Sequence, residues 1–154
     1  MGDTIEQRLA DLGVALPAAA APAANYVPYS RTGNLVMTAG QLPLRDGKLS
    51  ATGLLGQDLD VATGQEAAKY CAINILAQAK AAIGDLARIK RIVKITVFVA
   101  SAPGFVEQHL VANGASDFLV AVLGDNGKHA RSAVGTAALP LNAPVEIEAV
   151  IEVE

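Results

Sequence analysis

Hydrophobic and polar positions divide the chain into stretches with strand spacing and stretches with helix spacing. Residues 26–49 are rich in β-favouring side chains and are interrupted by turn signals at residues 32–34 and 45–47, which predicts an antiparallel meander of about three strands. Apolar residues then recur at helical spacing from Asp60 to Ile83. Gly84 follows them, so we expect a long amphipathic helix that ends there.

Residues 92–100 alternate between two sets of side chains, which predicts a strand. One set, which includes Ile95, is expected to face a core. Ile92, Phe98 and, on the last strand, Val150 are expected on the second sheet face. Apolar side chains on that face would also have to be shielded from water, and association with other copies of the chain is the simplest way to do so.

A second helix is expected from about Pro103, a residue that suits a helix start, to Leu123, followed by a loop over residues 124–127. Two strands joined around residues 140–144 close the chain. The resulting order is β-β-β-α-β-α-β-β. This order predicts an α+β fold in which two helices pack on one face of a single mixed sheet of about six strands.

The N-terminal segment predicts a short additional helix. Asp3 can act as its N-cap, with Glu6 three residues later completing a capping box, and Gly13 supplies a stop. An Ala/Pro-rich linker follows through Ala24. The 154 residues fit one domain, 1–154, in which residues 1–20 form an extension of helix and linker.

The amino-acid composition disfavours several classes of function. The chain has 12 basic and 15 acidic residues and only 4% aromatic residues, which disfavours a nucleic-acid groove. One cysteine, Cys71, excludes an internal disulfide, and with two histidines it gives no metal-ligand spacing, so no metal is expected. No apolar run approaches the roughly 20 residues that span a bilayer, and residues 16–24 lack the basic flank of a signal peptide. A cytoplasmic location without membrane contact is therefore the default expectation.

Arg131 stands among small residues at the start of a predicted strand. Its planar guanidinium is suited to bind a carboxylate with two hydrogen bonds, although an arginine at a strand start is more often a solvated surface group. Glu146, Glu148 and Glu152 alternate with apolar residues on the last strand. A half-exposed strand shows the same pattern, but a carboxylate beside a pocket could also orient a water molecule or transfer a proton.

His109 and His129 could act as bases near neutral pH. Neither has a Ser, Cys or Asp partner at a recognisable nucleophile spacing in the sequence. A catalytic role is therefore not expected for either histidine.

Three stretches carry a resemblance to a known family. ARSAVGTAALPLNAPVEIEA, residues 130–149, resembles the C-terminal signature of the RidA/YjgF family, also described as endoribonuclease L-PSP or translation inhibitors. GNLVMTAGQLP and VKITVFVAS resemble the family's second and middle strands. The resemblance runs from about Ala21 to the C-terminus. It implies a chorismate-mutase-like fold and a homotrimer with sites in the clefts between subunits.

The resemblance also implies an activity: hydrolytic deamination of enamines and imines such as 2-aminoacrylate to a 2-keto acid and ammonia, without metal or organic cofactor. The family's essential arginine maps onto Arg131, which would clamp the substrate carboxylate. Its glutamate fifteen positions later maps onto Glu146, which would position the attacking water. The other implied substrate-binding positions are Tyr26, Ala39, Gly40 and Asn113, with Tyr29 ranked below Tyr26.

Two departures from the family pattern indicate a divergent subgroup. Ala39 stands where many deaminases carry serine, and Ala133 replaces a frequent cysteine. A trimer that binds a small carboxylate, such as a keto acid, for regulation without turnover is therefore the alternative to an enzyme. An RNA-directed activity ranks last because the chain is acidic and poor in aromatic residues.

Overall fold

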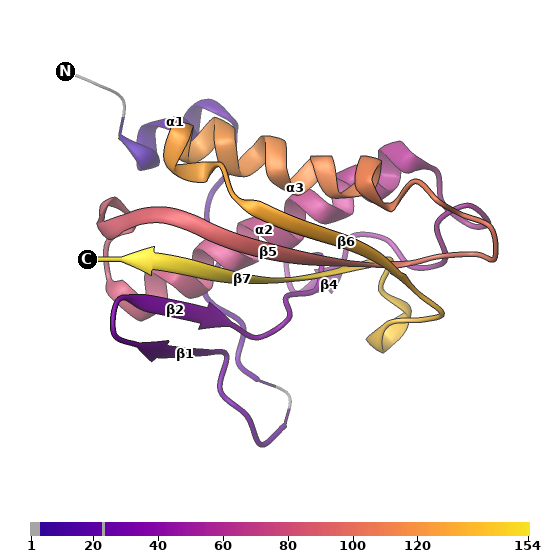
Figure 1. Cartoon of the computed structure of the whole chain (residues 1–154), viewed down its shortest axis with the longest axis horizontal. Helices are drawn as coiled ribbons and strands as arrows, with labels where there is room; N and C mark the ends of the chain where they lie inside the picture. The colour runs from indigo at the N-terminus through magenta and orange to yellow at the C-terminus, as the bar shows by residue number, and fades with distance from the viewer. Residues whose placement is uncertain (1–3, 23) are drawn as a thin grey trace.

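The computed structural model describes residues 4–22 and 24–154, which form an α+β fold with helices packed on one face of a sheet (Figure 1). A separate two-stranded sheet completes it. The helices are α1 (Ile5–Asp11), α2 (Val61–Ile83) and α3 (Gln108–Leu123), with short 3-10 turns η1 (Leu86–Arg88), η2 (Gly124–Gly127) and η3 (Pro140–Asn142). The strands are β1 (Tyr29–Thr32), β2 (Leu35–Thr38), β3 (Leu44–Arg45), β4 (Lys48–Leu49), β5 (Ile89–Ala100), β6 (Ala130–Thr136) and β7 (Val145–Val153).

The main sheet has the order β1-β2-β7-β5-β6. Its neighbouring strands are antiparallel except for β5 and β6, which are parallel. A parallel pair needs a crossover connection, and α3 provides it. The element order and the mixed sheet predicted from the sequence are therefore confirmed. The sheet has five strands and not six, because residues 26–49 form two separate hairpins, β1–β2 in the main sheet and β3–β4 outside it.

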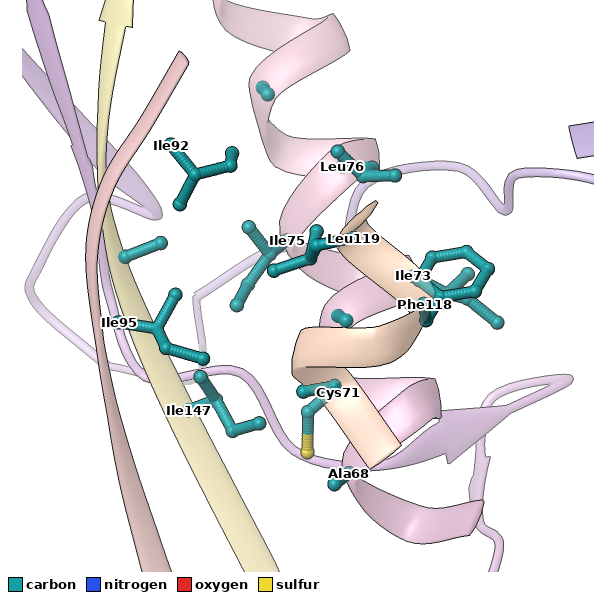
Figure 2. Close-up of a cluster of buried hydrophobic side chains, with 14 of the residues drawn as sticks. Ala68, Cys71, Ile73, Ile75, Leu76, Ile92, Ile95, Phe118, Leu119 and Ile147 are labelled. Carbon is teal, nitrogen blue, oxygen red and sulfur yellow. The ribbon is translucent and has the colours of Figure 1, made fainter. Parts of the chain in front are cut away.

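The core lies between the sheet and the two long helices (Figure 2). Ile95 of β5 and Ile147 of β7 point from the strands toward Ile75 of α2 and Leu119 of α3, and all four side chains are fully buried. Asp60 caps the start of α2 by accepting a hydrogen bond from the backbone N–H of Thr63. The predicted limits of this helix are confirmed, because these signals at both ends are strong.

The N-terminal helix is also confirmed, and Figure 1 shows it beside α3. Its N-cap is Thr4, whose Oγ1 accepts a hydrogen bond of 3.0 Å from the backbone N–H of Gln7. The cap expected at Asp3 lies outside the described residues. Arg8 donates to the carbonyl of Val122 at 3.2 Å and so ties α1 to the end of α3.

The prediction that Ile92 faces away from the core was wrong. The register between β5 and β7 shifts between Ile92 and Lys94, and a bulge of this kind changes which face the next residues occupy. Ile92 is consequently opposite Ile151 and is 1% exposed within the core. Phe98 and Val150 remain on the other face, which we call the open face, and both are only partly buried.

The predicted start of α3 at Pro103 was also wrong. The helix begins at Gln108, because residues 103–104 form a turn in which Gly104 has φ +85°. The stretch after α3, predicted as a loop, is the 3-10 turn η2. Among the described residues, none of the helices combines the length and the apolar character required to cross a membrane.

Candidate functional site

Arg131 lies on β6, an edge strand of the main sheet, and its side chain points toward α3. It stands opposite Ile95 in the parallel pairing of β5 and β6. Its Nη1 donates to Oδ1 of Asn113 at 2.9 Å and to Oγ of Ser116 at 3.0 Å. Its Nη2 donates to the carbonyl of His109 at 3.3 Å. Arg131 is thus a fixed, partly buried group and not the solvated surface charge that the sequence left open.

The guanidinium retains donors for a ligand. The two bonds from Nη1 use both of its hydrogens, and one hydrogen of Nη2 goes to His109. Within the described part of the chain, no acceptor is bound to Nε–H or to the second Nη2 hydrogen of Arg131. On the edge of a guanidinium that carries Nε, Nε–H and one Nη2 hydrogen are parallel, which is the geometry that binds both oxygens of one carboxylate.

Ser116 joins Arg131 to His129. Its Oγ lies 2.9 Å from Nε2 of His129, and Nδ1 of the same ring lies 2.6 Å from the carbonyl oxygen of Gly127. A carbonyl can only accept, so Nδ1 carries a hydrogen, and when the ring is neutral Nε2 accepts from the Ser116 hydroxyl. The sequence therefore missed a partner of His129. The spacing of His109, Asn113 and Ser116, which places them on one helix face, was the available signal.

Glu146 lies on the other side of the sheet. Its neighbours on β7, Val145 and Ile147, are fully buried beneath the helices, so strand alternation places Glu146 on the open face. Burial raises the pKa of Glu146 above its usual value, and the negative charge of Glu148 raises it further. Among the residues that the structure describes, no cation pairs with this carboxyl group, which therefore holds its proton more tightly than an exposed glutamate.

Gly40 is in direct contact with Glu146. A Cβ atom added at Gly40 would collide with Oε2 of Glu146, so only glycine leaves the carboxylate in its position. The environment of Glu146 also differs from that of the two other glutamates of β7. Glu148 is exposed, and Glu152 pairs with Arg91 at 2.8 Å.

The remaining predicted positions lie near Gly40 in the chain. The backbone N–H of Ala39 donates to the carbonyl of Pro28 at 2.8 Å, which holds the segment that follows Tyr26 beside Ala39. The Tyr26 side chain is 53% exposed. Tyr29 instead packs against the core and donates its hydroxyl to the carbonyl of Ala81 at 3.3 Å. Tyr26 is therefore the more accessible of the two tyrosines.

Arg131 and Glu146 lie on opposite faces of the sheet, and each has its own neighbours. The arginine group consists of the predicted Arg131 and Asn113 together with Ser116 and His129. The glutamate group consists of Glu146 and Gly40, with Ala39 and Tyr26 close to Gly40 in the chain. A single chain does not bring Arg131 and Glu146 together. Within the described residues there is also no cluster of three His, Cys, Asp or Glu side chains that could hold a metal ion.

Comparisons with known proteins agree with this arrangement of elements. Residues 6–152 match the family described as "YjgF/chorismate mutase-like, putative endoribonuclease". The chain is 51% identical over 149 residues to Protein TCP17 of Trypanosoma cruzi, covering 96% of this chain and 93% of that protein.

Two solved structures show how similar the relatives are in space. The protein Atu1372 of Agrobacterium tumefaciens, described as of unknown function, is 57% identical with a TM-score of 0.93, over 97% of this chain and 92% of its own. TdcF of E. coli, solved with bound serine, is 26% identical with a TM-score of 0.65, over 88% of this chain and 94% of its own. The match to the family model covers nearly the whole chain, and the chain therefore belongs to the RidA/YjgF family.

Proposed function

We propose that this protein is a RidA-like hydrolytic deaminase, which converts enamines and imines of the 2-aminoacrylate type to a 2-keto acid and ammonia. The observation that carries the proposal is the guanidinium of Arg131. It is held by Asn113, Ser116 and the His109 carbonyl, and it keeps two parallel N–H groups for a carboxylate. Substrates of this class carry a carboxylate on the carbon that reacts.

The protein does not need to activate the reacting carbon strongly, because an imine carbon is already electrophilic. Protonation of the enamine at its terminal carbon gives the imine. The oxygen of a water molecule then bonds to the imine carbon, and the water gives up a proton, which is transferred to nitrogen. The hydroxyl group so formed then loses its proton as the carbon–oxygen double bond forms and the carbon–nitrogen bond breaks, so ammonia leaves, the 2-keto acid remains and the proton taken up by the enamine is returned. Binding the carboxylate at Arg131 fixes the carbon, so orientation supplies much of the rate.

Glu146 is the group that we propose for positioning the water. Its carboxylate is partly buried beside Gly40, and a carboxylate in such a position can orient a water molecule by accepting a hydrogen bond from it. Gly40, in contact with Glu146, leaves its backbone open to the substrate. Tyr26, Ala39 and Asn113 complete the proposed substrate-binding set.

The two groups would meet between subunits of a homotrimer. Arg131 and Glu146 lie on opposite faces of one sheet, so both can touch one substrate only if they come from different chains. The open face supports association, because Phe98 and Val150 are only partly buried on it and Val134 is 44% exposed. Covering this face would bury these side chains and bring a cation to Glu146.

The family relative TdcF was solved with serine, a small molecule that carries a carboxylate and an amino group. This ligand is of the same chemical size and charge as the substrate class proposed here. It therefore favours a small carboxylate over a nucleic acid as the ligand of this chain.

The direct test is release of pyruvate and ammonia from 2-aminoacrylate generated by a second enzyme. We expect the wild-type protein to accelerate release, Arg131→Ala to abolish the acceleration, and Arg131→Lys to retain only a small part of it, because lysine cannot form the bidentate contact. Arg45→Ala, an exposed arginine in the β3–β4 hairpin, is the matched control. Equal rates for wild type, Arg131→Ala and buffer would overturn the proposal.

A trimer that binds a small carboxylate without turnover is the second candidate. Ala39 supports it, because this position lacks the hydroxyl that many deaminases present beside Gly40. Calorimetry with pyruvate and related 2-keto acids separates the two candidates. Binding that requires Arg131, without any release of ammonia from imines, would favour the regulatory function. Retention of labelled RNA that is unaffected by Arg131→Ala would instead favour the RNA-directed activity.

A further inference from the structure

The hydrogen bonds around Arg131 continue beyond the residues that can touch a ligand. Ser116 Oγ accepts from Arg131 at 3.0 Å and lies 2.9 Å from Nε2 of His129. His129 Nδ1 in turn lies 2.6 Å from the Gly127 carbonyl. Three elements contribute: α3 supplies Ser116, the turn η2 supplies Gly127, and the segment leading into β6 supplies His129.

The bond directions in this chain follow from the chemistry of its end groups. The Gly127 carbonyl can only accept, so Nδ1 of His129 donates, and when the ring is neutral Nε2 has a free lone pair. Arg131 can only donate, so Ser116 Oγ uses a lone pair for Arg131 and must direct its hydrogen elsewhere. Nε2 of His129 is the acceptor that it meets. Each group therefore fixes the orientation of the next.

We propose that Ser116 and His129 are positioning residues for Arg131, which hold the guanidinium in the plane where Nε–H and the remaining Nη2 hydrogen face a carboxylate. Without an acceptor at Ser116, the guanidinium would keep the bond to Asn113 and the longer contact of 3.3 Å to the His109 carbonyl, and one Nη1 hydrogen would lose its acceptor, so the plane of the group would be held less firmly. His129 acts through Ser116. Its Nε2 accepts the hydroxyl hydrogen of Ser116, so that a lone pair of Ser116 Oγ is directed at Arg131. This inference rests on the proposed carboxylate-binding role of Arg131.

By fixing the guanidinium of Arg131, Ser116 and His129 would also determine which class of ligand binds. Arg131 reaches its ligand through one edge of the guanidinium, since the bonds from Nη1 to Asn113 and Ser116 occupy the far end. A planar carboxylate that meets this edge with both oxygens gains two charged hydrogen bonds. An amide or ester of the same acid offers one carbonyl oxygen in that plane and gains only one. We therefore expect free 2-keto and 2-imino acids to bind, and their amides and esters to bind poorly.

Kinetics provide the first test. Ser116→Ala and His129→Leu should raise KM for the imine, or Kd for pyruvate, about tenfold each, with kcat changed much less. Ser116→Thr, which keeps a hydroxyl, and His129→Gln, which keeps an acceptor, should restore most of the affinity. Asp117→Asn, an exposed neighbour on α3, is the matched control and should change nothing. Variants that lower kcat at unchanged KM, with no rescue by the conservative replacements, would indicate a purely structural role and overturn the proposal.

A second test does not depend on catalysis. In protein labelled with 15N at arginine, a fixed guanidinium gives separate Nη1 and Nη2 signals, and Arg131→Lys identifies them. We expect separate Arg131 signals in wild type and a single averaged signal in Ser116→Ala and His129→Leu. If these signals remain separate in both variants, the positioning role is wrong, even if the protein is a deaminase. If wild type shows separate signals that collapse in the variants but no turnover, the positioning role stands and the deaminase function fails.

Discussion

Arg131 and Glu146 are carried by the same sheet but point from opposite faces of it. Arg131 stands opposite Ile95, on the side covered by α3, and Glu146 stands opposite Phe98, on the open face. The strands themselves impose this separation, since successive side chains alternate between faces. Any function that uses both residues on one ligand therefore requires a second copy of the chain.

The first prediction concerns the pKa of Glu146. Within one chain, burial and Glu148 raise this pKa above its usual value of 4.5. A neighbouring subunit that brings its Arg131 close would lower the pKa again, because an opposite charge favours the carboxylate. We therefore expect the pKa of Glu146 to be higher in Arg131→Ala than in wild type, as measured by NMR of side-chain carboxyl carbons. Identical values in the two proteins would show that Arg131 of a neighbouring subunit does not approach Glu146.

The same residue links stability to pH in the Arg131→Ala protein. A raised pKa means that the folded state binds the proton more tightly than the unfolded state. The resulting stability is fully present below the usual pKa of 4.5 and is lost as the pH rises through the raised pKa of the folded state. Adding Glu146→Gln should therefore increase the free energy of unfolding at pH 7 by a few tenths to about 1 kcal/mol, since solvent screens a partly buried group. At pH 4 the increase should disappear in urea unfolding curves.

The second prediction concerns Gly40. Replacing it with alanine would push a methyl group into the space of Glu146 Oε2. The end of a glutamate side chain can move aside at little cost, so we expect the melting temperature to change by only a few degrees. The displaced carboxylate should nevertheless lower kcat by roughly ten- to a hundredfold, as misplacement by about 1 Å does elsewhere. Gly47→Ala, which meets no atom within 4 Å but has φ +77°, is a control for backbone strain without contact to Glu146.

The sequence was sufficient to predict the elements whose boundary signals are local. Asp60 and Gly84 delimit α2 because an N-cap and a positive-φ glycine act within a few residues. The start of α3 had no such signal, since Glu107 makes no side-chain cap bond. The helix was predicted to start at Pro103 because proline suits a helix start, but Pro103 lies in a turn.

The site was predictable only in part, for a different reason. Spacing and resemblance predicted Arg131, Asn113, Gly40 and Glu146 as site residues, and the structure places them in two contacting pairs. Ser116 was missed because its partners are 13 and 15 residues away on other elements. Contacts of this kind depend on how α3 packs against β6, which no local pattern in the sequence encodes.

The third prediction tests the packing of α2 against α3. A Cβ atom added at Gly114 of α3 would collide with the backbone carbonyl of Gln65 on α2. In an exposed helix, replacing glycine by alanine stabilises the protein by about 1 kcal/mol. Here we expect the opposite sign, a loss of about 1 to 3 kcal/mol, because the backbone cannot yield without moving a helix. Thermal unfolding of Gly114→Ala measures it. Asp117→Ala, exposed on the same helix, should cause a slight increase in stability.

The fourth prediction uses Cys71 as a probe of the same core. Its thiol is fully buried on α2, with Sγ 3.6 Å from the Val145 carbonyl. Burial raises the pKa of Cys71 well above its usual value of 9.0, and the charge of Glu146 adds to this effect. Because the thiolate is the reactive form, we expect no modification by a thiol reagent between pH 7 and 9 in the folded protein, and complete modification in 6 M guanidinium chloride (about the concentration that unfolds most domains).

A thiol reagent can reach Cys71 in the folded protein only when the core opens, so the rate of its reaction measures that opening. Ser50→Cys, made in a Cys71→Ala background, places an exposed thiol in the loop after β4 and should react within seconds to minutes, which controls for reagent quality. Gly114→Ala should make Cys71 react faster than in wild type, in proportion to the loss of stability, because both residues lie where α2 meets its neighbours. Rapid modification of Cys71 in the wild-type protein would contradict the close packing between α2 and β7.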